Sequence, residues 1–208
     1  MSQGLFFTLE GIEGSGKSSA LSCISEWLTQ EGIEFIVTRE PGGTELAERI
    51  RTCVTDPSEE SICIKAELLL MFAARAQHID QVIKPALNRG VCVVSDRYVD
   101  ASYAYQGAGR HIPDVWLDQL TAMVVSQCMP DATFVLDVPV SVGMSRIQHR
   151  DSLDRIEQED HAFFEKVRRY YLARAKQEPS RIKVINANED MALVHQALVG
   201  HLKEYIHG

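Results

Sequence analysis

The stretch Gly11-Ile-Glu-Gly-Ser-Gly-Lys17-Ser18 decides the fold of this 208-residue chain. It matches the pattern G-x-x-x-x-G-K-[ST], whose glycines let the backbone curl until its N–H groups point at a phosphate. The apolar residues 5–9 before it predict a buried strand, and apolar residues recur at helical spacing over 21–28. This order predicts a phosphate site, where Lys17 reaches the β- and γ-phosphates and the Ser18 hydroxyl ligates Mg²⁺. A glycine-rich turn with a chance Lys-Ser pair is the alternative, and the flanking strand and helix argue against it.

Composition limits the class of protein. The chain is 45% hydrophobic and 24% charged, which is typical of a soluble globular protein. Its net charge of −8 gives no excess of Lys and Arg with which to bind nucleic acid. The longest apolar run, residues 68–74, is too short to span a membrane, and no signal peptide is evident. Five cysteines without a C-x-x-C pair suggest neither zinc nor a disulfide framework, so we expect a cytoplasmic protein with no membrane or nucleic-acid partner.

Strand and helix patterns alternate along the chain. Strands are expected at residues 5–9, 34–38, 91–95, 132–138 and 182–185. Further helices are expected at residues 44–54, 65–87, 112–127, 139–150, 161–176 and 191–205. Apolar strands separated by helices predict an α/β fold of three layers, α/β/α, with a five-stranded parallel sheet covered on both faces. We interpret residues 1–208 as one domain that binds its ligands at the carboxyl ends of the strands.

Polar segments follow three of these strands at that edge. Asp96 and Arg97 follow the third strand, so Asp96 is a candidate Mg²⁺ ligand and Arg97 a candidate phosphate clamp. A helix N-cap Asp beside a surface Arg explains the same dipeptide equally well. The segment Thr-Arg-Glu-Pro-Gly-Gly-Thr at residues 38–44 follows the second strand, and by composition alone it is a connector.

Two further segments offer groups that suit a nucleoside. Phe72 and Arg75 share a face of the long helix, where a ring and a guanidinium stack on a base and bond to it. A Phe at this spacing is also typical of a core, whereas an Arg in an apolar helix needs a partner. Residues 102–110 combine hydroxyls, an amide and glycines, which suit sugar and base edges but also describe a helix end with a glycine-rich exit.

Three arginines, Arg146, Arg150 and Arg155, lie in or beside a charged loop at residues 151–160. In a phosphoryl transferase such arginines close over the donor and neutralise charge, although a solvated charged face is the ordinary interpretation. The phosphate loop itself has one basic residue, Lys17, so arginines from elsewhere are needed to balance a polyphosphate.

Taken together, these segments resemble thymidylate kinases of the bacterial type, a family of P-loop nucleoside monophosphate kinases. The resemblance covers nearly the whole chain. Its motifs are Glu-Gly-Ile-Glu-Gly-Ser-Gly-Lys-Ser-Ser (10–19), the segment at 38–44, Phe-Ala-Ala-Arg (72–75), Asp-Arg-Tyr (96–98), Ala-Tyr-Gln-Gly (104–107), Leu-Asp-Val (136–138) and Asp-Arg-Ile-Glu (154–157). The resemblance implies a homodimeric kinase of the P-loop NTPase fold that uses Mg·ATP to phosphorylate dTMP to dTDP, in dTTP biosynthesis.

The resemblance also implies the site residues. For ATP these are Gly11, Ile12, Glu13, Gly14, Ser15, Gly16, Lys17, Ser18, Ser19, Arg146, Ala187 and Asn188. For dTMP they are Glu13, Glu40, Pro41, Arg51, Phe72, Arg75, Arg97, Ser102, Tyr105 and Gln106. The catalytic set is Lys17, Asp96, Arg97, Arg150 and Arg155, with Ser18 and Asp96 toward Mg²⁺. The helical lid covers about residues 146–160, and the acidic phosphate loop resembles the group whose lid supplies the arginines.

Individual roles follow from the same resemblance. Phe72 would stack on thymine, Arg75 would bond its O4 atom, and Ser102 and Gln106 would contact the base edge. Tyr105 would leave no room for a 2′-hydroxyl, and Glu13 would hold the 3′-hydroxyl. Arg51 and Arg97 would bind the monophosphate, with Glu40 and Pro41 beside it, while Arg146 would pack on adenine.

Two other functions stay open at this stage. A nucleotide or nucleoside kinase with another acceptor would share the phosphate loop and the lid. A nucleotide-dependent switch would bind and slowly hydrolyse its nucleotide, and a guanine-specific switch would need an N-K-x-D segment. The nearest segment here, residues 186–189, lacks the Lys.

Overall fold

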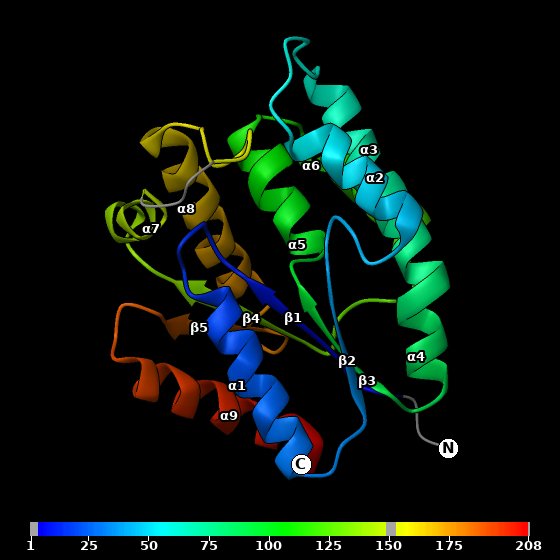
Figure 1. The fold of residues 1–208 in the computed structure, drawn as a ribbon, viewed down its shortest axis with the longest axis vertical. Helices are drawn as coiled ribbons and strands as arrows, with labels where there is room; N and C mark the ends of the chain where they lie inside the picture. The colour runs from blue at the N-terminus through cyan, green and yellow to red at the C-terminus, as the bar shows by residue number, and fades with distance from the viewer. Residues whose placement is uncertain (1–3, 149–152, 208) are drawn as a thin grey trace.

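A five-stranded parallel sheet forms the centre of the molecule, as Figure 1 shows for the computed structural model, which describes residues 4–148 and 153–207. The strands are β1 (Phe6–Glu10), β2 (Phe35–Arg39), β3 (Cys92–Asp96), β4 (Ala132–Asp137) and β5 (Ile182–Asn186). Their order in the sheet is β2-β3-β1-β4-β5, and every pair is parallel. The predicted fold class and all five predicted strands are therefore confirmed.

Helices cover both faces of the sheet. On one face lie α1 (Lys17–Gln30) and α9 (Met191–His207), which pack against each other (Figure 1). On the other face lie α8 (His161–Gln177), α5 (Val99–Ser102) and α6 (Asp114–Val124). Two further helices, α2 (Glu45–Thr55) and α3 (Ile64–His78), pack side by side near the carboxyl ends of β2 and β3. Helix α7 (Val140–Ile147) follows β4.

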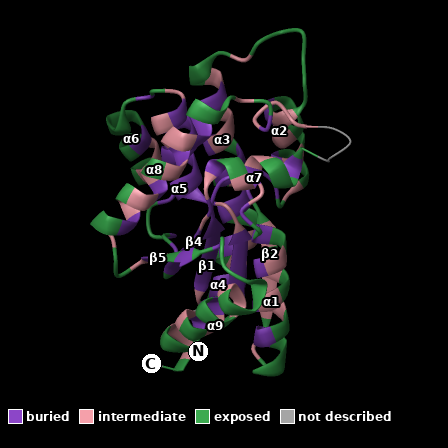
Figure 2. Ribbon diagram, turned by 90° about the vertical axis from the view of Figure 1, so that its left-hand side faces the viewer, coloured by how far each residue is buried: buried purple, intermediate pink, exposed green. Residues whose placement is uncertain are grey.

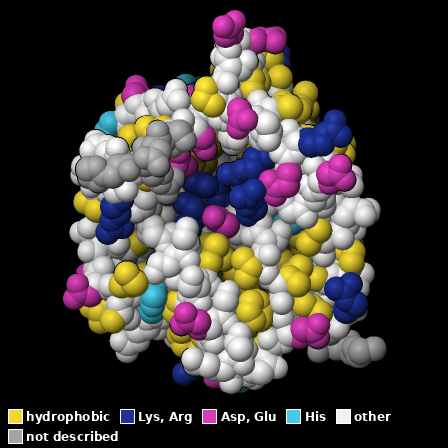
Figure 3. All heavy atoms as spheres, in the orientation of Figure 1, with side chains coloured by type: hydrophobic (Ala, Val, Ile, Leu, Met, Phe, Trp, Pro, Cys, Tyr) yellow, Lys and Arg dark blue, Asp and Glu magenta, His cyan; other side chains and the backbone are white. Residues whose placement is uncertain are grey.

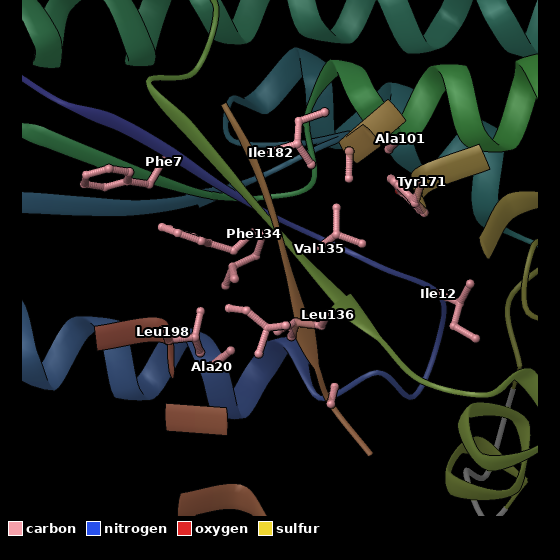
Figure 4. Close-up of a cluster of buried hydrophobic side chains, with 14 of the residues drawn as sticks. Phe7, Ile12, Ala20, Ala101, Phe134, Val135, Leu136, Tyr171, Ile182 and Leu198 are labelled. Atoms are coloured by element: carbon pink, nitrogen blue, oxygen red, sulfur yellow. The ribbon is translucent and has the colours of Figure 1, made fainter. Parts of the chain in front are cut away.

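Alternating side chains of the central strands fill both interior layers. Phe134 and Leu136 face Ala20 of α1 and Leu198 of α9, whereas Val135 lies on the opposite side of β4 (Figure 4). Every residue of β1 is buried, while the edge strand β2 is only partly covered, as Figure 2 shows in purple against pink and green. A sheet buried on both faces explains why the strands read as nearly continuous apolar runs.

The long helical run predicted at residues 65–87 exists, but it is not uniform. It begins with α3, continues as a wider π-helical turn, η1 (Ile79–Ile83), and ends as α4 (Lys84–Asn88). Pro85 lies at the start of α4 and has no N–H to donate. The wider turn before it removes the clash that a proline ring makes with the preceding turn of a regular α-helix.

One helical segment was not expected. Residues 99–109 form α5 and a second π-helical segment, η2 (Tyr103–Gly109), where the sequence suggested at most a helix end. Its glycines serve packing: a Cβ on Gly109 would lie 2.5 Å from the ring of Phe163 on α8. The glycine-rich composition that disguised this helix therefore permits the close approach of α8.

The remaining helices follow the prediction at their starts. Thr44 caps α2 by accepting a hydrogen bond from the Ala47 N–H at 3.1 Å, as expected of a threonine at this position. The helix predicted at residues 139–150 begins as expected, and its last two residues lie outside the described part of the chain. None of the helices in residues 4–148 and 153–207 combines the length and apolar character that crossing a membrane requires.

Candidate active site

The phosphate loop connects β1 to α1 as predicted. Gly11, Gly14 and Gly16 adopt φ values of 138°, 70° and 95°, a region that side chains disfavour, and Gly16 is the residue before α1. A Cβ on Gly14 would lie 2.1 Å from the carbonyl oxygen of Gly143 on α7, so α7 packs directly on the loop. The loop amides and the start of α1 together form an anion site.

Lys17 lies folded into this loop. Its Nζ donates to the carbonyl oxygens of Gly11 and Ile12, each at 3.1 Å, and it is 8% exposed. Burial, helped by the like charge of Arg97, lowers the pKa of Lys17 to about 8. The ammonium group is therefore held by weak neutral acceptors, which phosphate oxygens can replace with stronger bonds.

A pocket opens beside the loop, and Figure 3 shows a hollow there in which Lys and Arg side chains gather between acidic ones. The lining comes from the loop, from the segments after β2 and β3, from α2, α3, α5 and η2, and from residues 154 and 156. Its polar residues are Glu13, Glu40, Arg51, Thr55, Arg97, Gln106, Asp154 and the hydroxyl-bearing Tyr105. Segments that are distant in sequence thus meet around one pocket, where we expect dTMP to bind.

Arg97 is the central cation of this pocket. Its guanidinium donates to the Glu13 carboxylate at 2.6 Å and to the Tyr105 hydroxyl at 3.0 Å, and that hydroxyl donates to the Glu13 Oε2 at 2.8 Å. The Nε of Arg97 is buried and has no hydrogen-bond partner among the described residues. An anion near Arg97 would therefore meet a donor that the folded protein leaves unused.

Arg51 lines the same pocket and donates to the Pro41 carbonyl oxygen at 3.1 Å. Burial, together with the like charges of Arg39 and Arg97, holds the pKa of Arg51 below its usual value. Two guanidinium groups that repel each other across a pocket favour the binding of an anion between them.

The predicted base-side residues Phe72, Arg75 and Ser102 lie deeper. Arg75 is 1% exposed and donates to Glu40 at 2.7 Å and to the Ser102 hydroxyl at 3.0 Å, while its guanidinium stacks 4.8 Å from the centre of the Phe72 ring. The described residues that line the pocket do not include these three. Phe72 thus occupies a core position here, and its contact with a base stays a prediction.

His78 completes this buried chain and was not among the predicted residues. Its Nδ1 bonds with Glu40 at 2.9 Å, and its Nε2 bonds with the Thr38 hydroxyl at 2.6 Å. The segment after β2 is thereby fixed to α3. A histidine three residues after Arg75 on a helix shares its face, which is the signal that the sequence offered.

Arg155 contacts α2 and α3 instead of the phosphate loop. It donates to the Val54 carbonyl oxygen at 2.7 Å and to Glu67 at 2.6 Å, and Glu67 also accepts from Gln106 at 2.9 Å. Although burial opposes it, the hydrogen bond from Gln106 and the charges of Arg110 and Arg155 keep the pKa of Glu67 below its usual value. Glu67 was not predicted, and Arg150 lies outside the described residues.

A second hollow adjoins the loop, and its lining includes the predicted ATP residues Gly14, Ser15, Gly16, Ser19, Arg146 and Ala187 but not Asn188. Arg146 of α7 donates to the Gly14 carbonyl oxygen at 3.0 Å, and Ala187 follows β5. The lining also includes residues of α9 that the sequence did not single out, namely Met191, Val194 and His195. Ser19 bonds with His195 at 3.1 Å, and the Asn188 N–H donates to the Asn186 side chain at 3.1 Å.

The two predicted Mg²⁺ ligands lie in different elements, Ser18 in α1 and Asp96 at the end of β3. Ser18 is exposed in the first turn of α1, and Asp96 ends β3 opposite Leu9 of β1. The Asp96 Oδ1 is buried with no hydrogen-bond partner in the described part of the chain. An unpaired carboxylate oxygen and a hydroxyl fit Mg²⁺, which takes few protein oxygens and relies on phosphates and water for the rest. Among the described residues, no group of three or more His, Cys, Asp or Glu side chains could hold a metal ion.

Comparison with known proteins places this architecture in one family. A model of the thymidylate kinase family matches residues 9–198. A thymidylate kinase of Alcanivorax borkumensis is 51% identical over 201 residues, covering 97% of both chains. One of Pseudomonas entomophila is 51% identical over 195 residues, covering 94% of this chain and 93% of the other. The crystal structure of thymidylate kinase from Ehrlichia chaffeensis superposes with a TM-score of 0.78 at 32% identity, covering 97% of this chain and 99% of that one.

Proposed function

Because the chain belongs to the thymidylate kinase family, we propose that it transfers the γ-phosphoryl group of ATP to dTMP, giving dTDP for dTTP biosynthesis. The observation that carries this proposal is the pair of hollows on either side of the phosphate loop. One is lined by Arg51 and Arg97, and the other by Arg146 and α9. Two nucleotides bound there would meet end to end at Lys17.

The chemistry requires charge stabilisation more than a base. An oxygen of the dTMP phosphate forms a bond to the γ-phosphorus, and the bond from that phosphorus to the β–γ bridging oxygen breaks as ADP leaves. The attacking phosphate is already ionised, so no proton has to be removed. Lys17 would exchange its two loop carbonyls for phosphate oxygens and stabilise charge in a loose, in-line transition state.

On the acceptor side, Arg51 and Arg97 would bind the monophosphate, with Glu40 and Pro41 beside it. Glu13 and Tyr105 would face the sugar, where their mutual hydrogen bond fixes both groups. Gln106 would contact the base edge because its buried Oε1 has no partner among the described residues. Phe72, Arg75 and Ser102 would support or contact the base from α3 and α5.

On the donor side, residues 11–19 would hold the ATP phosphates. Arg146 and Ala187, which line the second hollow, would adjoin adenine together with the neighbouring Asn188. Ser18 and Asp96 would hold Mg²⁺, which neutralises charge on the β- and γ-phosphates. The lid would comprise about residues 146–160, with Arg155, and Arg150 beyond the described residues, supplying the missing positive charge.

We also propose that the protein is a homodimer in the cytoplasm, where ATP and Mg²⁺ are available. The neighbouring helices α3 and α6 carry large exposed apolar side chains, among them Leu69 at 57% and Met123 at 71% exposure. Apolar side chains gathered on adjacent helices favour burial against a second copy. Residues 1–208 would act as one functional domain.

A coupled assay of ADP release with a panel of acceptors tests the proposed function. dTMP, dUMP, AMP, GMP, CMP and thymidine are each supplied with ATP and Mg²⁺. We expect dTMP to support the highest kcat/KM. A higher kcat/KM for another monophosphate would identify that nucleotide as the acceptor in place of dTMP. ATP hydrolysis that no acceptor accelerates would favour a nucleotide-dependent switch instead.

A further inference from the structure

A buried carboxylate, Glu10, lies immediately before the phosphate loop, and none of the roles above involves it. It ends β1 and is 0% exposed. Its Oε1 accepts the Tyr98 backbone N–H at 2.8 Å, and its Oε2 accepts the Tyr171 hydroxyl of α8 at 2.6 Å. One side chain thus joins β1, the segment after β3 and α8.

The segment that Glu10 holds has an unusual backbone. Arg97 adopts φ 65°, a left-handed conformation that is strained for a large side chain and persists only where its surroundings enforce it. The Arg97 N–H donates to the Leu9 carbonyl oxygen at 2.9 Å, and the Ser95 hydroxyl donates to the Arg97 carbonyl oxygen at 2.8 Å. Glu10 accepts the next N–H along the chain, that of Tyr98. Three hydrogen bonds with residues of β1 and β3 therefore hold this turn.

The direction of the Arg97 side chain follows from this turn. A return of Arg97 to the ordinary right-handed or extended region would aim its Cβ elsewhere. The guanidinium that now reaches Glu13 and Tyr105 in the pocket would then leave its place. Burial and the nearby charge of Asp100 raise the pKa of Glu10 to about 8, although the hydrogen bonds from Tyr171 and Tyr98 oppose this rise.

We propose that Glu10 is a positioning residue for the acceptor site: by accepting the Tyr98 N–H it enforces the left-handed turn that aims Arg97 at the phosphate of the acceptor. The proposal rests on the proposed function, because that function makes Arg97 a ligand of the monophosphate. Glu10 itself touches neither nucleotide. Its effect is therefore on the binding of an acceptor that carries a phosphate.

Calorimetric binding of dTMP and of thymidine separates this role from a general effect on folding. Glu10→Ala removes the acceptor, and we expect the Kd for dTMP to rise at least tenfold while the Kd for thymidine changes less than threefold. Glu10→Gln keeps an oxygen for the Tyr98 N–H, and we expect its Kd for dTMP within threefold of the original value. Equal weakening of both ligands in Glu10→Ala, or an unchanged Kd for dTMP, would overturn the proposal.

Two further variants complete the design. Asp131→Asn is the matched control, because Asp131 accepts the Phe6 N–H at 2.7 Å at the opposite end of the same strand, and it should leave dTMP binding unchanged. If Glu10→Ala does not fold, Glu10→Asp decides: its shorter carboxylate should weaken dTMP binding, and normal binding would overturn the proposal. If the unmodified protein does not phosphorylate dTMP, the proposed function fails. If the unmodified protein phosphorylates dTMP but the variants bind dTMP normally, only this inference fails.

Discussion

At the scale of single residues, the fold lowers the pKa values of two cations of the site, Lys17 and Arg51. Lys17 is buried against two carbonyl oxygens, and Arg51 faces Arg97. Each of these cations gains a better partner when phosphate enters. The phosphate loop and its neighbouring cations therefore favour polyphosphate, which composition alone, with its net charge of −8, would not suggest.

The pH dependence of ATP use should report Lys17. Because burial lowers the pKa of Lys17 to about 8, the side chain is charged below that pH and loses its charge above it. With dTMP saturating, kcat/KM for ATP should be level below about pH 8 and fall up to tenfold per pH unit above it.

Glu10 titrates in the same range, so Glu10→Gln is the control for this profile. The variant should keep the fall above pH 8 if Lys17 causes it. A profile that stays level to pH 9.5 in the unmodified protein would show that the charge of Lys17 is not required.

The proposed stacking of Phe72 on thymine can be tested without leaving a cavity in the core. Phe72→Leu keeps most of the apolar volume in the buried position but removes the aromatic face. Stacking of a base on an aromatic ring contributes about 1–3 kcal/mol, so KM for dTMP should rise fivefold or more while KM for ATP stays constant. An equal change in both constants would assign Phe72 to the core alone.

At this scale, the sequence and its resemblance to a family named residues that the fold brings together. Glu13, Arg51, Arg97, Tyr105 and Gln106 line one pocket, and its binding of dTMP stays a prediction. The hydrogen-bond partner of each side chain in the fold could not be predicted from the sequence. Arg75 and Arg155 are engaged by Glu40 and Glu67, from segments far away in sequence, and no local pattern indicates such pairs.

At the scale of elements, close packing of α8 on η2 positions the acceptor side. The Gly109 position leaves no room for a Cβ beside Phe163, and η2 carries Tyr105 and Gln106. The sequence concealed this helix because glycines and a π-helical turn are poor helix signals. The parallel strands, by contrast, were predictable from apolar runs alone.

Gly109→Ala tests that packing. The added methyl would lie 2.5 Å from the Phe163 ring, so α8 or η2 has to shift at a cost of about 1–3 kcal/mol in the free energy of unfolding. Urea denaturation measures this, and KM for dTMP should rise with it. Gly200→Ala on α9 adds a Cβ that meets no atom of the neighbouring elements within 4 Å in the described part of the chain. This substitution should instead stabilise the protein by about 0.5–1 kcal/mol. Equal effects of the two substitutions would contradict this account of η2.

At the scale of the whole molecule, the exposed apolar surface is uneven. Large apolar side chains on α3 and α6 lie on neighbouring helices, whereas Leu193, at 51% exposure, lies on α9. The proposed dimer would use the face formed by α3 and α6, which is separate from the phosphate loop. Nothing in the sequence pattern marks this face, because exposed apolar residues within a helix look like core residues until the fold is known.

The proposed homodimer predicts a clear difference in size between variants. Met123→Glu, which puts a charge on α6, should shift the protein toward a monomer in size-exclusion chromatography with light scattering. Leu193→Glu is the matched control on α9 and should leave the mass unchanged. A monomeric unmodified protein, or a dimer that survives Met123→Glu and dissociates in Leu193→Glu, would contradict the assignment.

In the proposed function, two nucleotides lie end to end across one phosphate loop, so that the phosphoryl group passes directly between them. The stereochemistry of transfer tests it most directly, with ATP whose γ-phosphorus is made chiral by oxygen isotopes and dTMP as the acceptor. A single in-line transfer predicts inverted configuration at the transferred phosphorus of dTDP. Retained configuration would require an intermediate phosphorylated on the protein, and would contradict the account.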